Sequence, residues 1–532
     1  MRPGRLFSYL LPSLVDVLFI SLVLALAYGS PSLRLLNDPG IGWHIRTGEW
    51  ILQNHAIPHT DLFSNLTTRP WFAWEWLFDL GIGKVHAWWG LNGVLASGAM
   101  VIALTFALLF RLTLRRGASL LPAMVFVVLA VLASTIHGLA RPHLFTWLFT
   151  LLCWYLIEEK RSTLWLWTIP AILLVWANIH GGFLVAFALM GLTLAGDLWN
   201  FVGGRDDHAR EDAVRVSRVL ATALVASFVN PYGTALYSHI YQYLTDSFLM
   251  HHIQEMQSPD FRTVAAKCLF VLLLLTTSVA IIRRSRLRPG EMLVLVFFAY
   301  EALFAARNIP LACIVLTLTV APVLAPLEES KSPIHPLRQR LRRFSDRMGA
   351  MEFQTRGHLW AIAFAVVTLG VCAHGGRLLG TQVIDANFNA DKFPVHAVDF
   401  VVQHPSASPL FTTDAWGGYV IYRAWPTVRV VVDDRHDMYG SEYMKRYLKV
   451  VEGNWDWRQQ LQATGARAAL VSPSSAIGSL LRLSPEWRLV YDDGQALIFE
   501  TTEPANSPPS PPGQTLQGQT LTGQTLTGQT LK

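Results

Sequence analysis

Long apolar runs separated by short polar connections follow one another from Leu10 to Leu379. A helix that crosses the hydrocarbon core of a membrane needs about 20 apolar residues, and most of these runs approach that length. The first run, Leu10 to Tyr28, is followed by no small-residue cleavage site, so it is expected to be a retained anchor. The pattern predicts about eleven membrane-spanning helices. They are expected near residues 10–29, 90–111, 119–138, 143–157, 163–177, 181–202, 217–230, 266–282, 290–306, 309–326 and 359–379.

The pattern changes after the last run. Apolar stretches at Thr427–Val432 and Ala468–Val471 alternate with helical patterns at Ser441–Val451 and Trp455–Thr464. The chain is therefore predicted to be an α-helical polytopic membrane protein over residues 1–380, followed by a small α/β domain over residues 385–501. Residues 502–532 are rich in Pro and Ser and then repeat Gly-Gln-Thr-Leu, so this tail is predicted to be disordered.

Basic residues distinguish the two sides of the membrane. If Arg2 and Arg5 keep the N-terminus in the cytoplasm, the cytoplasmic connections are all rich in Lys or Arg, as the positive-inside rule requires. These connections are Arg111–Arg116, Glu158–Arg161, Arg205–Arg218, Arg283–Arg288 and Lys331–Arg347. The pattern predicts a multi-pass protein of the bacterial inner membrane whose long first loop, residues 30–89, and C-terminal domain are extracytoplasmic.

The composition supports this class and excludes others. Of 532 residues, 52% are hydrophobic and 15% are charged, whereas about 25% charged residues are usual in a soluble domain. The net charge of +6 comes mostly from the short connections, which argues against a nucleic-acid partner. All four cysteines lie in apolar runs and are expected to be small hydrophobic fillers: Cys153, Cys268, Cys313 and Cys372.

Polar residues gather in the outward connections. A polar group at membrane depth costs a few kcal/mol, so several on one side predict a cavity with a function. For any single residue, the alternative is a helix cap or an interfacial anchor. The residues expected at this cavity from the later connections are Arg141, His143, Asn178, His180, His251, Glu255 and Arg307.

The first external loop begins with Asn37-Asp38, which places an acidic residue at the boundary between water and lipid. Further along, Trp71–Asp79 is predicted to form an amphipathic helix on the membrane surface, with Trp71, Trp74 and Trp76 as braces. Glu75 and Asp79 would share one face of that helix, where they either add charge to the cavity or face water.

These features resemble the GT-C superfamily of membrane glycosyltransferases, which includes protein mannosyltransferases, aminoarabinose transferases and oligosaccharyltransferases. The resemblance consists of an acidic residue at the outer end of the first helix, a long first external loop with interfacial helices, about eleven to thirteen spans and a C-terminal extracytoplasmic domain. The adjacent pair of acids that is common in the superfamily is replaced here by Asn37-Asp38.

The C-terminal domain carries a weaker similarity. Thr413–Ile421, followed by Val431-Val432-Asp433-Asp434-Arg435, resembles the Trp-Trp-Asp motif of oligosaccharyltransferases and the strand after it. The paired tryptophans are missing, so recognition of a protein sequon is not implied. A structural turn at Gly417-Gly418 is the alternative.

The resemblance implies an inverting transfer of a sugar from a polyprenyl-phosphate donor to an acceptor glycan, lipid or protein. It implies Asp38 as the base that removes the acceptor proton. Arg307 and Arg141, with Arg46 in reserve, would bind the donor phosphate. Membrane lipid is the other expected partner.

A divalent metal near the phosphate, Mg²⁺ or Mn²⁺, is left open. His44, His143, His180, His251 and Glu255 could supply ligands, but their spacing matches no tight metal motif.

Two other functions remain open. One is a transporter or flippase of lipid-linked saccharides, although such proteins usually show internal repeats and polar residues near the bilayer midplane. The other is a non-catalytic protein of cell-envelope assembly that keeps the same fold. The sequence contains no Gly-rich nucleotide-binding loop, which favours a lipid-linked donor.

Overall fold

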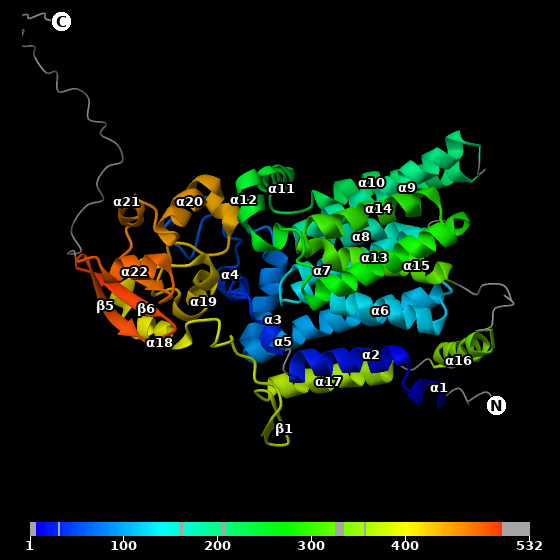
Figure 1. Ribbon diagram of the computed structural model, residues 1–532, viewed down its shortest axis with the longest axis horizontal. Helices are drawn as coiled ribbons and strands as arrows, with labels where there is room; N and C mark the ends of the chain where they lie inside the picture. Colours follow the sequence, from blue (N-terminus) through cyan, green and yellow to red (C-terminus); the bar gives the residue numbers. More distant parts are fainter. Residues whose placement is uncertain are drawn as a thin grey trace, which may run out of the picture.

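The computed structural model describes residues 7–29, 32–159, 163–204, 208–324, 335–355 and 358–502. Its helices lie side by side in one body, and a smaller domain sits at one end of them (Figure 1). Arg2, Arg5, parts of three basic connections (residues 160–162, 205–207 and 331–334) and the repetitive tail from residue 503 lie outside the described residues.

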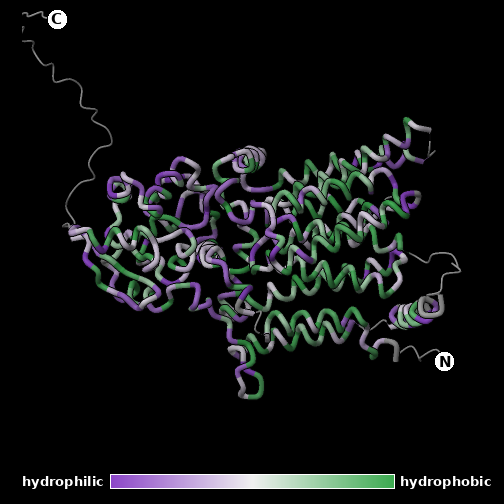
Figure 2. Tube along the Cα trace, in the orientation of Figure 1, coloured by the Kyte–Doolittle hydropathy of each residue, from purple (hydrophilic) through white to green (hydrophobic). Residues whose placement is uncertain are grey.

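A helix lies at each predicted span, and Figure 2 shows that most of these helices are predominantly hydrophobic. They are α2 (Leu14–Val23) with its π-helical extension η1 (Leu24–Tyr28), α5 (Trp76–Arg115), α6 (Leu120–Ser134) with η2 (Thr135–His137), α7 (His143–Glu159), η3 (Leu164–Trp167) with α8 (Thr168–Trp176), η4 (Gly181–Phe183) with α9 (Leu184–Val202), α10 (Ala209–Ser227), α13 (Val264–Ile282), α14 (Pro289–Phe304), η7 (Ala306–Asn308) with α15 (Ile309–Val323), and α17 (Leu359–Ala373).

Within the described ranges, five of these helical segments have the length and composition to cross a membrane: Trp76–Arg115, Leu120–His137, Gly181–Val202, Val264–Ile282 and Ala306–Val323. Shorter apolar segments occur at Leu14–Tyr28, Leu164–Trp176 and Leu359–Ala373. The remaining helices and turns outside the C-terminal domain are α1 (Phe7–Leu10), α3 (Ser32–Leu35), α4 (Gly40–Asn54), α11 (Ala235–Thr245), α12 (Ser247–His252), η5 (Gln254–Met256), η6 (Arg284–Arg286) and α16 (His335–Gln354).

Helix α15 lies at the centre of the helical body. It packs against α5, α6, α7, α13 and α14, and every residue from Ile309 to Ala321 is buried. A helix that is apolar on all faces can be covered by neighbouring helices or by lipid, and α15 is covered by its neighbours. This central placement brings Arg307 and Asn308, just before α15, beside the connections around residues 137–143 and 180–182.

Helices α4 and α5 cross at very short range. A Cβ atom added at Gly48 would lie 1.8 Å from the carbonyl oxygen of Asp79, and one added at Gly83 would lie 2.6 Å from the carbonyl carbon of Gly48. Only glycine permits this approach, which sets His44 on α4 against Asp79 on α5. Gly90, at φ 59°, separates the first part of α5 from the long apolar part that follows.

The predicted surface helix at Trp71–Asp79 is wrong in its first half, because α5 begins at Trp76. The role of Trp71 and Trp74 as membrane-surface braces is also wrong. Trp71 is only 4% exposed, because later parts of the chain cover it, and Trp74 lines an internal cavity.

The C-terminal domain contains a four-stranded sheet in the order β3-β4-β6-β5, in which β3 and β4 are parallel and the other pairs are antiparallel. Its elements are α18 (Val395–Gln403), η8 (Pro405–Ala407), β3 (Leu410–Thr412), α19 (Asp414–Ala424), α20 (His436–Val451), α21 (Trp457–Ala463), β4 (Ala468–Val471), α22 (Ala476–Arg482), β5 (Trp487–Asp492) and β6 (Leu497–Thr501). A small hairpin, β1 (Arg377–Leu378) and β2 (Thr381–Gln382), precedes it.

The predicted strand at Ala468–Val471 and the helix at Ser441–Val451 are confirmed, the latter as part of α20. The predicted strand at Thr427–Val432 is wrong. Only Val430 forms bridges there, one to Leu410 and one to Ser64 of the first external loop. The segment therefore joins the sheet to that loop.

Candidate active site

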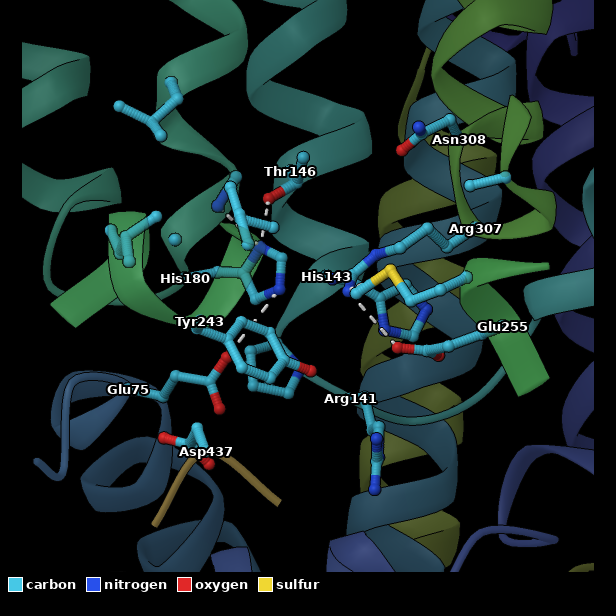
Figure 3. Close-up of a pocket in the computed structure, with 18 of the residues that line it drawn as sticks. Glu75, Arg141, His143, Thr146, His180, Tyr243, Glu255, Arg307, Asn308 and Asp437 are labelled. Atoms are coloured by element: carbon cyan, nitrogen blue, oxygen red, sulfur yellow. Dashed lines mark hydrogen bonds and ion pairs between the residues drawn. The ribbon is translucent and has the colours of Figure 1, made fainter. Parts of the chain in front are cut away.

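A cavity of about 580 Å³ lies where one end of the membrane-type helices meets the C-terminal domain. Its walls come from α4, the segment before α5, the connections around residues 137–143 and 180–182, η5, η7 and the loop that leads into α20. Figure 3 shows Glu75 and His180 on one side of this cavity, with Arg307 and Glu255 on the other.

Arg141 joins two carboxylates from distant parts of the chain. Its Nε lies 2.7 Å from Oδ2 of Asp38, and its Nη2 forms an ion pair with Asp434 of the C-terminal domain. Burial opposes the charge of the guanidinium, but Asp38 and Asp434 outweigh this effect and raise the pKa of Arg141 above its ordinary value. The cation is therefore permanent, and part of it faces the cavity.

Gly40 makes this arrangement possible. Its N–H donates to Oδ1 of Asp38 at 2.8 Å, and a Cβ at this position would lie 1.8 Å from Nη2 of Arg141 and 2.5 Å from Asp434. Both oxygens of Asp38 are thus engaged, one by Gly40 and one by Arg141. Asp38 is not among the described residues that line the cavity.

Arg307 supplies the second cation. Its Nη1 lies 3.3 Å from Glu255, whose other oxygen lies 3.5 Å from Nε2 of His137. Burial raises the pKa of Glu255, but Arg307 and the neighbouring cations prevail and lower it to about 2. Glu255 is therefore ionised and orients Arg307 toward the cavity. We call Arg141 and Arg307 the arginine pair.

Glu75 occupies the other side of the cavity. Its two oxygens lie 3.7 Å from Nε2 of His44 and 3.7 Å from Nε2 of His180. Burial raises the pKa of Glu75 to about 8. Nδ1 of His44 is hydrogen-bonded to Asp79 at 2.5 Å, so Glu75 and Asp79 lie at opposite nitrogens of one imidazole ring.

The tautomer of His180 follows from its backbone contact. The N–H of Gly182 donates to Nδ1 at 3.0 Å, and burial lowers the pKa of His180 to about 3. The ring is therefore neutral with its proton on Nε2, which faces Glu75.

One wall of the cavity is apolar. It is formed by residues of α9, α14 and α15: Leu184, Val185, Ala188, Phe297, Phe298, Phe304 and Leu311. Phe304 is 58% exposed, so this wall reaches the outer surface of the helical body. The cavity therefore joins a charged interior to an apolar flank.

The structure brings most of the predicted residues together. Glu75, Asp79, His44, Arg141, His143, His180, Glu255 and Arg307 all line the cavity. Asp38 contacts it only through Arg141.

Besides Asp38, three predicted residues do not line the cavity, and those predictions are corrected. Arg46 donates to the carbonyl oxygen of Tyr422 and pairs with Glu49 at 2.7 Å. His251 is exposed and bonds to the carbonyl oxygen of Ser247. Asn178 is a brace, because its amide oxygen accepts from the Trp76 indole at 2.8 Å and its amide nitrogen donates to two carbonyl oxygens.

The C-terminal domain also contributes to the cavity, which the sequence did not predict. Asp434, Arg435, His436 and Asp437 line the cavity, together with His137 and Tyr243. The run Val431–Arg435 stood out only through its similarity to a motif, and no spacing within the sequence linked it to Arg141.

The loop that carries Asp434 is held rigidly. Arg435 is buried, with its Nη2 2.8 Å from Asp61 of the first external loop and 2.7 Å from Asp433. Its guanidinium lies 4.7 Å from the ring centroid of Trp71. This contact between domains fixes the position of Asp434.

The described residues form no group of three His, Cys, Asp or Glu side chains that could hold a metal ion. His143 uses Nε2 for the carbonyl oxygen of His137, and His180 uses Nδ1 for Gly182.

No family model matches the chain, and no curated protein matches it. Among solved structures, the chain is similar to ArnT from Cupriavidus metallidurans bound to undecaprenyl phosphate. The identity is 14% and the TM-score is 0.48, over 91% of this chain and 97% of that one.

Proposed function

We propose that this chain is an integral membrane glycosyltransferase that transfers a sugar from a polyprenyl-phosphate donor to an extracytoplasmic acceptor. One observation carries the proposal: the arginine pair lies in a cavity that also has an apolar wall at the surface of the helical body. A sugar attached to a phosphate on an isoprenoid chain presents the matching combination of a polar head, an anionic group and an apolar tail. The site would face the extracytoplasmic side of a bacterial inner membrane.

In this proposal Arg141 and Arg307 bind the donor phosphate. Guanidinium groups form paired hydrogen bonds with phosphate oxygens and remain charged in a buried site. The same contacts would stabilise the negative charge that collects on the phosphate as its bond to the sugar breaks, which is the main electrostatic requirement of this reaction.

The transfer is proposed to invert the anomeric carbon, because a single displacement needs only one carboxylate base and no covalent intermediate on the protein. The resemblance to the GT-C superfamily implies Asp38 as that base. Because Gly40 and Arg141 engage both oxygens of Asp38, the proposal assigns Asp38 a different role, which is to orient Arg141 toward the phosphate.

The test is turnover of radiolabelled polyprenyl-phosphate sugars, supplied as a small panel to the purified full-length protein in lipid nanodiscs, with membrane extract as the source of acceptor. The wild type should consume one donor, and Arg307→Gln should weaken binding of that donor by tenfold or more. Arg488→Gln is the matched control, because Arg488 is an exposed residue on β5 that pairs only with Glu500 among the described residues.

Binding without turnover of any donor by the wild type would overturn the enzyme function. Movement of the bound lipid between the two leaflets would then favour the flippase. Unchanged donor binding by Arg307→Gln would show that the arginine pair does not bind the donor phosphate as proposed.

A further inference from the structure

Most carboxyl groups in the cavity already have a close polar partner. Asp79 bonds to His44 at 2.5 Å, Glu301 accepts from the Asn308 amide at 2.8 Å, and Asp437 lies 3.0 Å from His239. Asp434 pairs with Arg141, and Glu255 with Arg307. Among the described cavity residues, Glu75 is the carboxyl whose closest polar partners, His44 and His180, lie beyond hydrogen-bond distance at 3.7 Å.

The backbone around Glu75 is anchored on both sides. The N–H of Asp79 donates to the carbonyl oxygen of Glu75 at 3.0 Å, and the N–H of Leu77 donates to that of Asn178 at 3.1 Å. The Trp76 indole adds a bond to the Asn178 side chain. These contacts hold the start of α5, so the side chain of Glu75 points into the cavity from a fixed backbone position (Figure 3).

His180 and His44 contact Glu75 in different ways. His180 presents its Nε2–H, because Gly182 occupies Nδ1, and an N–H donor stabilises a carboxylate. His44 is bonded to Asp79 through Nδ1, which fixes the plane of its ring and directs Nε2 at Glu75. A group held between two oriented rings, with room for one more hydrogen-bond partner, is suited to receive a proton from a substrate.

On the basis of the proposed function, we propose that Glu75 is the catalytic residue that takes the proton from the acceptor hydroxyl, and that His44 and His180 are its positioning residues. The acceptor oxygen forms a bond to the anomeric carbon of the donor sugar. The bond between that carbon and the phosphate oxygen breaks, and its electron pair leaves with the polyprenyl phosphate, which the arginine pair binds. The hydroxyl proton passes to a carboxylate oxygen of Glu75, so atoms and charges balance.

The charged surroundings of Glu75 agree with this role. His44 and Asp79 face it from α4 and α5, His180 from the turn before α9, and Tyr243 from α11; Arg141, Arg307, Glu255 and Asp437 act on it electrostatically from the remaining walls. Burial is the largest influence and raises the pKa of Glu75 to about 8, so the carboxylate is the minor form near pH 7 and, when it forms, is a stronger base than an ordinary glutamate.

The test compares Glu75→Gln with Glu500→Gln in single-turnover assays with saturating donor, and measures donor binding separately. Glu500 lies on β6, pairs with Arg488 and does not line the cavity. We expect Glu75→Gln to lose about 100-fold or more in rate, as removal of a general base does, with donor affinity unchanged within about twofold. Glu500→Gln should keep the wild-type rate.

A second variant guards against a purely structural effect. Glu75→Ala should be slow, and added formate should restore part of its rate by replacing the carboxylate. Three results would each overturn the role of Glu75: full activity of Glu75→Gln, loss of donor binding by Glu75→Gln, or no rescue of Glu75→Ala by formate. If the wild type is active in the same assays, the transferase function is not affected by these results. A wild type that turns over no donor would instead overturn the proposed function.

Discussion

Asp434 in the C-terminal domain and Arg141 in the connection before α7 form an ion pair that joins the two parts of the protein. Asp434 also accepts from the Trp43 indole of α4 at 3.0 Å. Asp434 of the C-terminal domain therefore contacts Arg141 of the helical body, which is proposed to bind the donor phosphate. Donor binding and the position of the C-terminal domain are therefore expected to be coupled through these two side chains.

The first prediction concerns Asp434→Asn. The substitution removes one of two carboxylates that neutralise Arg141, so the donor phosphate should meet less competition. Donor affinity is expected to rise by about threefold to tenfold, roughly the effect of 0.7–1.4 kcal/mol. Equilibrium binding of a radiolabelled donor to protein in nanodiscs measures this affinity. Weaker binding by Asp434→Asn would contradict competition between Asp434 and the phosphate for Arg141.

The second prediction is the pH dependence of the same affinity. Burial raises the pKa of Asp434 to about 6, and Asp38 adds to this effect while Arg141 opposes it. As the pH falls through 6, Asp434 gains a proton and releases Arg141, whereas the phosphodiester of the donor remains charged. Wild-type affinity should rise between pH 7 and pH 5. In Asp434→Asn this rise should be absent, and a rise that persists there would assign it to another group.

The third prediction concerns Gly40→Ala. The added methyl would lie 1.8 Å from Arg141 and 2.5 Å from Asp434, so the ion pair must move. We expect a loss of about 1–3 kcal/mol in stability, the usual range for an overpacked site, and weaker donor binding. The matched control is Gly81→Ala, where nothing lies within 4 Å of the new atom. Thermal unfolding and donor binding of both variants are the measurements, and equal behaviour of the two would contradict the steric argument.

The membrane-type helices could be predicted from the sequence because each depends on a local property, a continuous apolar run. The helix of residues 309–323 shows this well, since its apolar run is continuous. Its position at the centre could not be predicted from that run, because the equally apolar helices of residues 120–137 and 264–282 are less buried. The first external loop could not be predicted in the same way. The sequence around Trp71 is typical of an interfacial tryptophan, but in the structure Arg435, far along the chain, covers its ring.

The site was predicted only in part for the same reason. His44, Arg141 and Arg307 could be found because polar residues at outer helix ends are conspicuous. Asp38 was identified as a carboxylate of interest, but its role depends on Arg141, which lies in another connection. The sequence places Asp434 within a plausible strand end, and nothing local connects it to the cavity.

The fourth prediction concerns Arg435→Met. Arg435 lies between the buried carboxylates of Asp61 and Asp433. Burial raises the pKa of Asp61, but Arg435 and the local hydrogen bonds prevail and lower it. Removal of the cation leaves two uncompensated buried charges, which typically costs about 3–5 kcal/mol.

The measurement for Arg435→Met is limited proteolysis across a temperature series, with Arg488→Met as the exposed control. The C-terminal domain of Arg435→Met should become sensitive at a lower temperature than that of the control. Equal sensitivity would show that the ion pairs between the loop and the domain contribute little to their attachment.

The fifth prediction tests the orientation that the basic connections predict. Trp455 lies in the C-terminal domain and is 91% exposed, so Trp455→Cys should accept a label without disturbing a core. Arg286 lies in a basic connection on the opposite end of the helices and is also exposed. The native Cys153, Cys313 and Cys372 are buried and should stay unlabelled, and Cys268, which is partly exposed, is replaced by Ala in both variants.

If the C-terminal domain is extracytoplasmic, a maleimide that cannot cross the inner membrane should label Trp455→Cys in spheroplasts, and should label Arg286→Cys only after the membrane is permeabilised. This result is required by the proposed function, because a donor site beside the C-terminal domain then faces a compartment without nucleotide sugars. The reverse pattern would place the cavity in the cytoplasm. The missing nucleotide-binding loop would then no longer favour a lipid-linked donor, because nucleotide sugars are present in the cytoplasm. That outcome would contradict the proposed donor.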